Sequence, residues 1–263
     1  MGLKHLVFVL LFYISAGIFV SLGVVKTKAV GHGYFVFHGL GAAGLAVISF
    51  FLLERGSLGL IFKLFFAFYV FFSLAYLLFI GRPAFKIGFY LLAVLSCLVV
   101  IGSDVLAHHP NGSQVFPSAL YFLSNAIFSC LLLGFTLAAM LLGHWYLVDP
   151  KLSIDELKRV TLFLCGLILF RFFLGTSLCL PLFSGKSEFE IYTYLLSETP
   201  GIFLLMRWTW GLFLPLILGY LAWNTVKIRS TQSATGILYV TVVCVLTGEI
   251  MSQYLALYHG MPL

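Results

Sequence analysis

The sequence predicts an all-α protein: a polytopic transmembrane helical bundle of about eight spans, with both termini outside. Hydrophobic residues make up 62% of the 263 residues, charged residues only 9%, and the mean hydropathy is +1.10. Soluble domains carry about 25% charged residues, so water is not the main solvent of this chain. The lipid bilayer is therefore the first partner that the composition predicts.

Eight apolar runs are long enough to cross about 30 Å of hydrocarbon at about 1.5 Å per helical residue. The predicted spans lie near residues 4–24, 32–53, 58–80, 85–106, 118–148, 159–183, 201–226 and 234–258. The first run is too long for the apolar core of a signal peptide, so we interpret it as an uncleaved span. The short connections leave no room for a soluble domain, which makes residues 1–263 a single integral membrane domain.

Turn-forming residues separate the spans where the apolar runs end. They are Gly81-Arg82-Pro83, Pro110-Asn111-Gly112, Asp149-Pro150 and Thr199-Pro200-Gly201. Ser153 and Glu156 have the spacing of a capping box, which predicts the start of the sixth helix.

The basic residues near the helix ends predict the orientation, because positively charged loops stay on the cytoplasmic side. Nine lie in the odd-numbered loops: Lys26, Lys28, Arg82, Lys86, Lys151, Lys158, Arg159, Lys227 and Arg229. Three lie on the opposite side: Lys4, Arg55 and Lys186. Both termini are therefore predicted to lie outside, and the expected location is a bacterial inner (cytoplasmic) membrane.

Several function classes find no support in the sequence. The basic residues form no continuous run, so no nucleic-acid partner is predicted. P-loop, GxSxG and HExxH motifs are absent, and no GxGxxG follows a predicted strand. At most, the chain is a subunit of a membrane-bound oxidoreductase.

Four of the ionisable residues within the predicted spans stand out, because a charge inside hydrocarbon is costly and each one is a candidate site. Arg171 lies near the middle of the sixth span and Glu249 slightly outward of the middle of the eighth. Arg207 and Asp104 lie near the outer ends of the seventh and fourth spans. They are expected to form a polar cluster in the outer half of the membrane, together with two residues of the fifth span, Asn125 and Tyr121.

Two interpretations of this cluster stay open. In the structural one, Arg171 pairs with Glu249, or Arg207 with Asp104, and the pairs only neutralise charge between packed helices. In the functional one, the cluster lines a cavity for a quinone head group and exchanges its protons. Glu249 is then the proton acceptor and Arg171 or Arg207 its charge partner. The remaining members, Asp104, Asn125 and Tyr121, are expected to contact the head group.

The histidines suggest a second possible cofactor. His38 and His144 lie at similar depths on the second and fifth spans, and two such histidines can hold a b-type haem. The same residues also fit an interfacial belt. His108 and His109, beside Pro110, are interpreted as solvated loop residues, and no metal site is predicted.

Two short patterns near the C-terminus carry a family resemblance. Arg207, Gly211 and Pro215 follow one another at intervals of four residues, and Gly248-Glu249 lies on the last span. These patterns resemble the membrane anchor subunits of dimethyl sulfoxide and polysulfide reductases. The resemblance implies two packed four-helix bundles, exchange of electrons with membrane quinone and an iron–sulfur partner subunit; of the site residues, it carries over only Arg207 and Glu249.

The first functional hypothesis is therefore a quinone-interacting membrane subunit of a respiratory electron-transfer complex, with a redox partner subunit. The alternatives are a transporter or channel-like permease for a small solute or anion, a b-type haem protein, and a structural assembly subunit. Arg171 in the middle of the membrane favours an anion among the solutes.

Overall fold

A computed structural model describes residues 3–53, 59–108, 119–149 and 152–262. These residues form eight helical segments that are long and apolar enough to cross a membrane, and they contain no strand. The segments are α1 (Leu3–Ser21), α3 (His32–Leu52), α4 (Leu60–Leu78), α5 (Pro83–His108), α6 (Ala119–Val148), α7 (Asp155–Phe183), Thr199–Lys227 and α11 (Thr231–His259). The predicted membrane helical bundle is confirmed. Arg55, His109, Pro110-Asn111-Gly112, Pro150 and Lys151 lie outside the described residues.

The seventh segment is not a continuous α-helix. It consists of α9 (Thr199–Trp208), the π-helical turn η1 (Thr209–Phe213) and α10 (Leu214–Lys227). A one-turn helix, α2 (Thr27–Val30), connects α1 to α3. Helix α8 (Glu188–Ser197) precedes α9.

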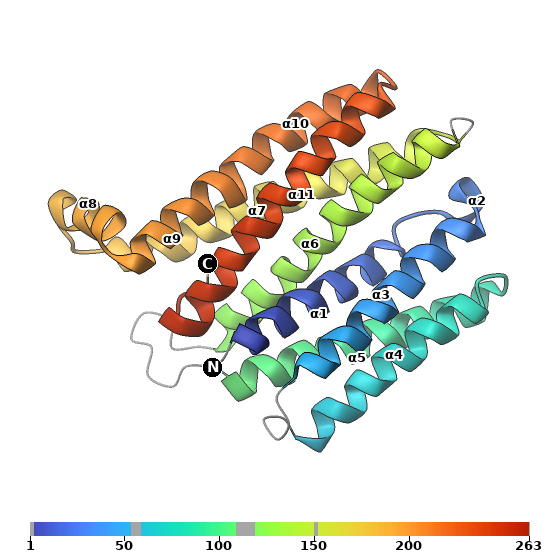
Figure 1. The fold of residues 1–263 in the computed structure, drawn as a ribbon, viewed down its shortest axis with the longest axis horizontal. Coiled ribbons are helices and arrows are strands. Elements are labelled where there is room, and N and C mark those ends of the chain that lie inside the picture. Colours follow the sequence, from blue (N-terminus) through green and yellow to red (C-terminus); the bar gives the residue numbers. More distant parts are fainter. Residues whose placement is uncertain (1–2, 54–58, 109–118, 150–151, 263) are drawn as a thin grey trace.

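The spans form two groups of four. In the N-terminal group α1 contacts α3, α3 contacts α4, α4 contacts α5, and α5 returns to α1. In the C-terminal group α6, α7, α10 and α11 contact one another in the same cyclic way. Helices α1 and α5 join the groups by packing on α6 (Figure 1). Helix α1 begins and α11 ends at the same end of the bundle, here called the terminal end (Figure 1). The side of the membrane that this end faces stays a prediction.

A glycine pair permits the close contact between the two groups. A Cβ atom added to Gly17 of α1 would lie 2.0 Å from the carbonyl oxygen of Cys130 on α6. One added to Gly134 would lie 2.2 Å from the Cα atom of Gly17. In a bilayer, where lipid is as apolar as leucine, such small residues let helix backbones approach and gain van der Waals contact.

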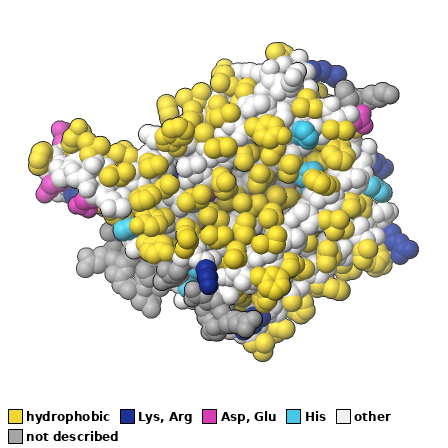
Figure 2. All heavy atoms as spheres, viewed as in Figure 1, with side chains coloured by type: hydrophobic (Ala, Val, Ile, Leu, Met, Phe, Trp, Pro, Cys, Tyr) yellow, Lys and Arg dark blue, Asp and Glu magenta, His cyan; other side chains and the backbone are white. Residues whose placement is uncertain are grey.

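The outer surface of the bundle is apolar. Large side chains such as Phe51 (81% exposed) and Leu78 (83% exposed) point away from the core. Figure 2 shows that hydrophobic side chains cover most of one face, while charged side chains gather at its ends and on α8. Such a surface suits lipid rather than water.

The predicted capping box at the start of the sixth span is wrong. Ser153 donates to the Asp155 carboxylate (2.6 Å) instead of capping the helix. Glu156 is buried and accepts hydrogen bonds from the Lys26 backbone and the Arg159 guanidinium, both 3.0 Å away. The tertiary contact outcompetes the local one, because Glu156 ties the loop after α1 to the start of α7.

A capping box does occur at α8, a helix that the sequence reading missed. Ser187 accepts a hydrogen bond from the Glu190 backbone, and the Glu190 carboxylate accepts one from the Ser187 backbone. These hydrogen bonds from Ser187 lower the pKa of Glu190. Helix α8 projects beyond the bundle (Figure 1), with Phe189 78% and Tyr192 65% exposed. Exposed aromatic residues on a short helix outside the spans are typical of a membrane-interface position.

Candidate functional site

Three charged side chains meet inside the C-terminal group and are called here the arginine–glutamate cluster. Arg171 on α7, Arg207 on α9 and Glu249 on α11 are only 2%, 1% and 0% exposed. Arg207 Nη2 donates to Glu249 Oε1 at 2.7 Å, and Arg171 Nη2 lies 3.7 Å from Glu249 Oε2. The three residues predicted to carry the chemistry thus come together, from three different helices.

The cluster lies deep in the bundle. Glu249 comes ten residues before the end of α11, which places it about 15 Å along the helix from the terminal end. Arg207 comes eight residues after the start of α9, or about 12 Å along it. An exposed ion pair contributes little, but a buried one is held in a medium where an uncompensated charge is costly.

Polar side chains of α6 and α11 extend the cluster. Arg171 Nη2 donates to Asn125 Oδ1, to Ser129 Oγ (3.1 Å) and to Ser252 Oγ (3.2 Å). Gln253 Nε2 donates to Ser129 Oγ at 3.1 Å. Asn125 was predicted, whereas Ser129, Ser252 and Gln253 were missed. Their signal was helical spacing: Ser129 follows Asn125 by four residues, and the other two follow Glu249 by three and four.

Two glycines position Arg207 and Glu249. The backbones of Gly211 and Gly248 touch, since a Cβ added to Gly211 would lie 2.5 Å from the Cα atom of Gly248. The same Cβ would come within 3.0 Å of Arg207 Nη1. The π-helical turn that contains Gly211 begins two residues after Arg207, and such turns are frequent at functional sites. Four of the residues that carry the family resemblance, Arg207, Gly211, Gly248 and Glu249, are thus neighbours in space.

The charges of the cluster do not cancel. Two guanidinium groups face one carboxylate, which leaves one net positive charge among the three groups when all are ionised. Arg207 Nε and Nη1 are buried and have no hydrogen-bond acceptor among the described residues. Buried donors of a charged group are normally satisfied. The cluster therefore offers N–H donors and positive charge to a carbonyl or anionic oxygen.

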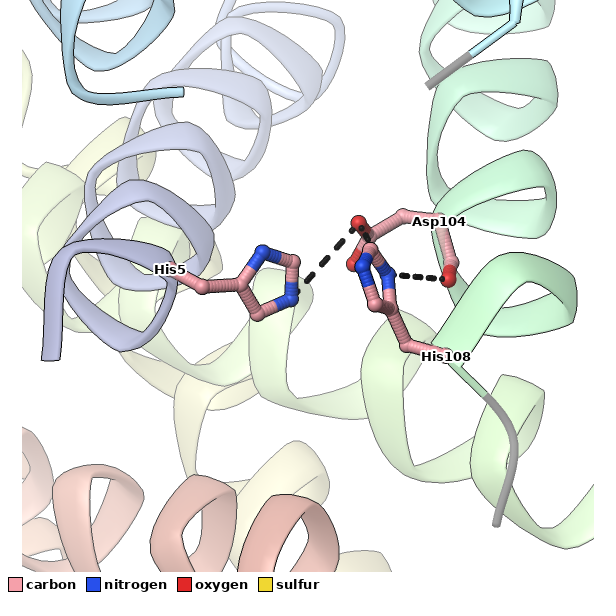
Figure 3. A group of neighbouring side chains, drawn as sticks. All are labelled: His5, Asp104 and His108. Atoms are coloured by element: carbon pink, nitrogen blue, oxygen red, sulfur yellow. Dashed lines mark hydrogen bonds and ion pairs between the residues drawn. The ribbon is translucent and has the colours of Figure 1, made fainter. Parts of the chain in front are cut away.

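Asp104 belongs to a second group, so its predicted pairing with Arg207 is wrong. Its carboxylate Oδ1 lies 3.1 Å from Nδ1 of His108 and 3.7 Å from Nε2 of His5 (Figure 3). His108 is the last residue of α5 and packs against His5 of α1, with the ring centres 4.1 Å apart and the ring planes tilted by 47°. The interpretation of His108 as a solvated loop residue is therefore wrong, and His5 was missed. We call these three residues the His–Asp–His group.

A small cavity lies between the His–Asp–His group and the polar side chains that extend the arginine–glutamate cluster. It has a volume of about 30 Å³, and Asp104 and His108 line one part of it while Asn125 and Gln253 line another, with Tyr13 between the helices. About 10–15 Å³ suffices for one water molecule with polar neighbours. Water in this cavity would connect the His–Asp–His group to the hydrogen-bond network of Arg171.

Tyr121 and the two histidines proposed for haem do not join these groups. Tyr121 is 40% exposed and lies at the surface of the bundle. His38 is 3% exposed and its Nδ1 lies 2.6 Å from the Tyr34 carbonyl oxygen, whereas His144 is exposed. Within the described ranges, no contact links His38 to His144. The structure therefore gives no geometric support to a haem held between them.

Comparisons with family models, curated proteins and solved structures find no match to this chain. The function has to be argued from the arginine–glutamate cluster, the cavity and the His–Asp–His group.

Proposed function

We propose that this protein is a quinone-interacting membrane subunit of an electron-transfer complex. The observation that carries the proposal concerns Arg207, which is 1% exposed. Its Nε and Nη1 atoms are buried and have no hydrogen-bond acceptor among the described residues. A quinone carbonyl oxygen is an uncharged acceptor that gains negative charge on reduction. A preorganised guanidinium donor in a water-poor site stabilises that developing charge.

The three charged residues have separate roles in this proposal. Arg207 and Arg171 donate hydrogen bonds to the head group. Glu249 orients both guanidinium groups, because each of its carboxylate oxygens faces one of them. The sequence predicted Glu249 as proton acceptor, and the proposal assigns it instead to fixing the two donors.

Proton transfer is assigned to the cavity. Tyr13, Asn125 and Gln253 provide hydroxyl and amide groups along it, and Asp104 and His108 line it toward the terminal end. The cavity of about 30 Å³ holds water and is smaller than a quinone ring. Head-group binding therefore requires the helices around Arg207 to separate locally, and the π-helical turn beside it interrupts the regular α-helix of this span.

The proposal includes a redox partner. The chain has no soluble domain among its described residues to hold an electron carrier, so electrons must pass to another subunit at one membrane face. The family resemblance implies an iron–sulfur protein in that position. The proposed location is a bacterial inner membrane.

The first test measures quinone binding to the protein in lipid nanodiscs. Short-chain ubiquinone and menaquinone analogues are titrated while tryptophan fluorescence is followed, because Trp208 lies next to Arg207. Wild type should bind saturably, and Glu249→Gln and Arg207→Gln should each weaken binding at least about 10-fold, as loss of a charged hydrogen bond predicts. Glu156→Gln is the matched control. Glu156 is also buried and paired with an arginine, but it lies at the start of α7, away from Arg171 in the middle of that helix. Equal binding by all variants would exclude the proposal.

A triple variant separates this function from a purely structural charge cluster. Replacing all three members, as in Arg171→Met and Arg207→Met with Glu249→Leu, removes every charge of the cluster and costs less stability than a single change that leaves a buried charge unpaired. If the cluster is only structural, the triple variant keeps the quinone binding of wild type. Under the proposal it is stably inserted and lacks binding.

A second candidate function rests on the net positive charge of the cluster. Two buried guanidinium groups with one carboxylate suit an anionic solute as well as a quinone. In that case the lone protein in proteoliposomes should take up a small anion without any redox partner. Absence of uptake together with quinone binding supports the first proposal.

A further inference from the structure

We propose that the His–Asp–His group binds a divalent transition-metal ion of the zinc type. The three side chains offer two imidazole nitrogens and a carboxylate oxygen, the donor types that zinc uses in proteins. One donor of each residue lies within 4.8 Å of the others. The site is separate from the arginine–glutamate cluster, and the inference does not depend on quinone binding.

The distances fit a common metal ligand sphere. Zinc bonds of about 2.0–2.1 Å in a tetrahedron put neighbouring ligand atoms about 3.3 Å apart. Here the Asp104 carboxylate oxygen lies 3.1 Å from His108 Nδ1 and 3.7 Å from His5 Nε2, values on either side of that spacing. Figure 3 shows the two rings facing the same carboxylate from different helices. Only small side-chain adjustments are needed to place one ion among the three donors.

The charge balance favours a cation. Asp104 is 6% exposed, and within the described ranges its ion pairs involve only the two histidines and no lysine or arginine. Buried carboxylates are normally paired with a cation or coordinate a metal. A divalent ion would neutralise Asp104 while both imidazoles remain neutral.

The surroundings of the three side chains leave room for a water molecule as fourth metal ligand, and the His108 ring can change its tautomer to bind the ion. Asp104 and His108 line the cavity of about 30 Å³, which is large enough for a water ligand. In the described arrangement His108 Nδ1 also lies 3.0 Å from the Asp104 carbonyl oxygen, which places a proton on that nitrogen. Metal binding through Nδ1 moves this proton to Nε2, so the ring keeps one N–H group and stays neutral.

The test uses the full chain in nanodiscs, first treated with chelator and then titrated with Zn²⁺ or Co²⁺ alone. Wild type should bind one ion per chain, with Co²⁺ giving the intense visible bands of tetrahedral coordination. His5→Ala, Asp104→Asn and His108→Ala should each weaken binding by more than about 100-fold, since even changes outside the ligand sphere weaken it about 10- to 100-fold. His32→Ala is the control, because His32 is an exposed histidine at the start of α3, a helix that carries none of the three proposed ligands.

Two further outcomes decide the proposal. Zn²⁺ should raise the unfolding temperature of wild type and of His32→Ala but not of Asp104→Asn, because only a folded site gains from binding. Absence of stoichiometric binding to wild type would reduce the group to a hydrogen-bonded Asp–His pair and overturn the proposal. Binding that persists in all three variants would show that the ion binds elsewhere and would also overturn the proposal.

Discussion

The two four-helix groups are built on different interactions. The N-terminal group encloses a column of aromatic rings whose neighbours lie 5.3–6.1 Å apart. Its members, all at most 3% exposed, are Phe8, Phe12, Phe19, Phe62, Phe66, Tyr69 and Tyr76. The C-terminal group instead encloses Arg171, Arg207 and Glu249. One group is held by ring packing and the other surrounds buried charge.

This difference suggests that the N-terminal group serves as a scaffold and that the C-terminal group holds the functional site. Apolar helices gain little from leaving lipid, so rings and small residues stabilise a bundle through close packing. Buried charges are costly there and are expected where function needs them. The cavity lies where both groups meet, lined by Tyr13 and Asp104 of the N-terminal group and by Asn125 and Gln253 of the C-terminal group. The junction is therefore the place where the scaffold contributes titratable residues to the site.

The largest expected effect on stability is that of Glu249→Gln. Removing the carboxylate leaves two buried guanidinium groups without their anion and should lower the free energy of unfolding by about 3–5 kcal/mol. Unfolding in mixed micelles measures the change. Glu156→Gln should cost less than about 1 kcal/mol, because its partner Arg159 is 34% exposed. Equal losses of unfolding free energy in the two variants would contradict the prediction, because the buried cluster would then contribute no more to stability than the pair of Glu156 and Arg159.

A slightly smaller loss is expected in the aromatic column. Phe19→Ala removes a ring that contacts both Tyr69 and Tyr76 and should cost about 3 kcal/mol, near the low end for core phenylalanines because lipid solvates the unfolded reference state well. Phe71→Ala is the control, since Phe71 is 61% exposed and should tolerate the change. Quinone binding should persist in Phe19→Ala. Its loss there would contradict the division into scaffold and site.

The junction is expected to be sensitive to a single methyl group. Gly17→Ala places a Cβ atom 2.0 Å from the Cys130 carbonyl oxygen, so α1 and α6 must move apart, at a cost of about 1–3 kcal/mol. Gly41→Ala meets no atom within 4 Å and should be neutral or slightly stabilising, as expected for alanine in a helix. Circular dichroism and micelle unfolding compare the two. A neutral Gly17→Ala would mean that the groups are not held by this contact.

The smallest effect should come from a hydrogen bond within the aromatic column. Ser15 donates to the Ala42 carbonyl oxygen at 2.7 Å and lies 2.9 Å from the Tyr69 hydroxyl. Ser15→Ala should cost about 0.6 kcal/mol, the average for side-chain hydrogen bonds between membrane helices. Ser177→Ala is the control, because the exposed Ser177 donates to the Leu174 carbonyl oxygen of its own helix. A cost above about 2 kcal/mol would show that polar contacts matter as much in the scaffold as in the site.

The sequence alone determined the class of fold and the helices on which the charged residues lie. Apolar run length has to match the thickness of the hydrocarbon layer, so eight spans could be counted without coordinates. The approximate levels of Arg171, Arg207 and Glu249 along their helices followed from the same count. Helix α8 was missed because its ten residues lie outside any span and form only a short periodic pattern.

Only the tertiary structure decided which side chains meet. Residue counting gives the level of a side chain along a helix, but neither the rotation of the helix nor the order of its neighbours. Those depend on close backbone contacts such as Gly17 with Gly134 and Gly211 with Gly248. These contacts bring Glu249 to two arginines and direct Asp104 toward the histidines instead of Arg207.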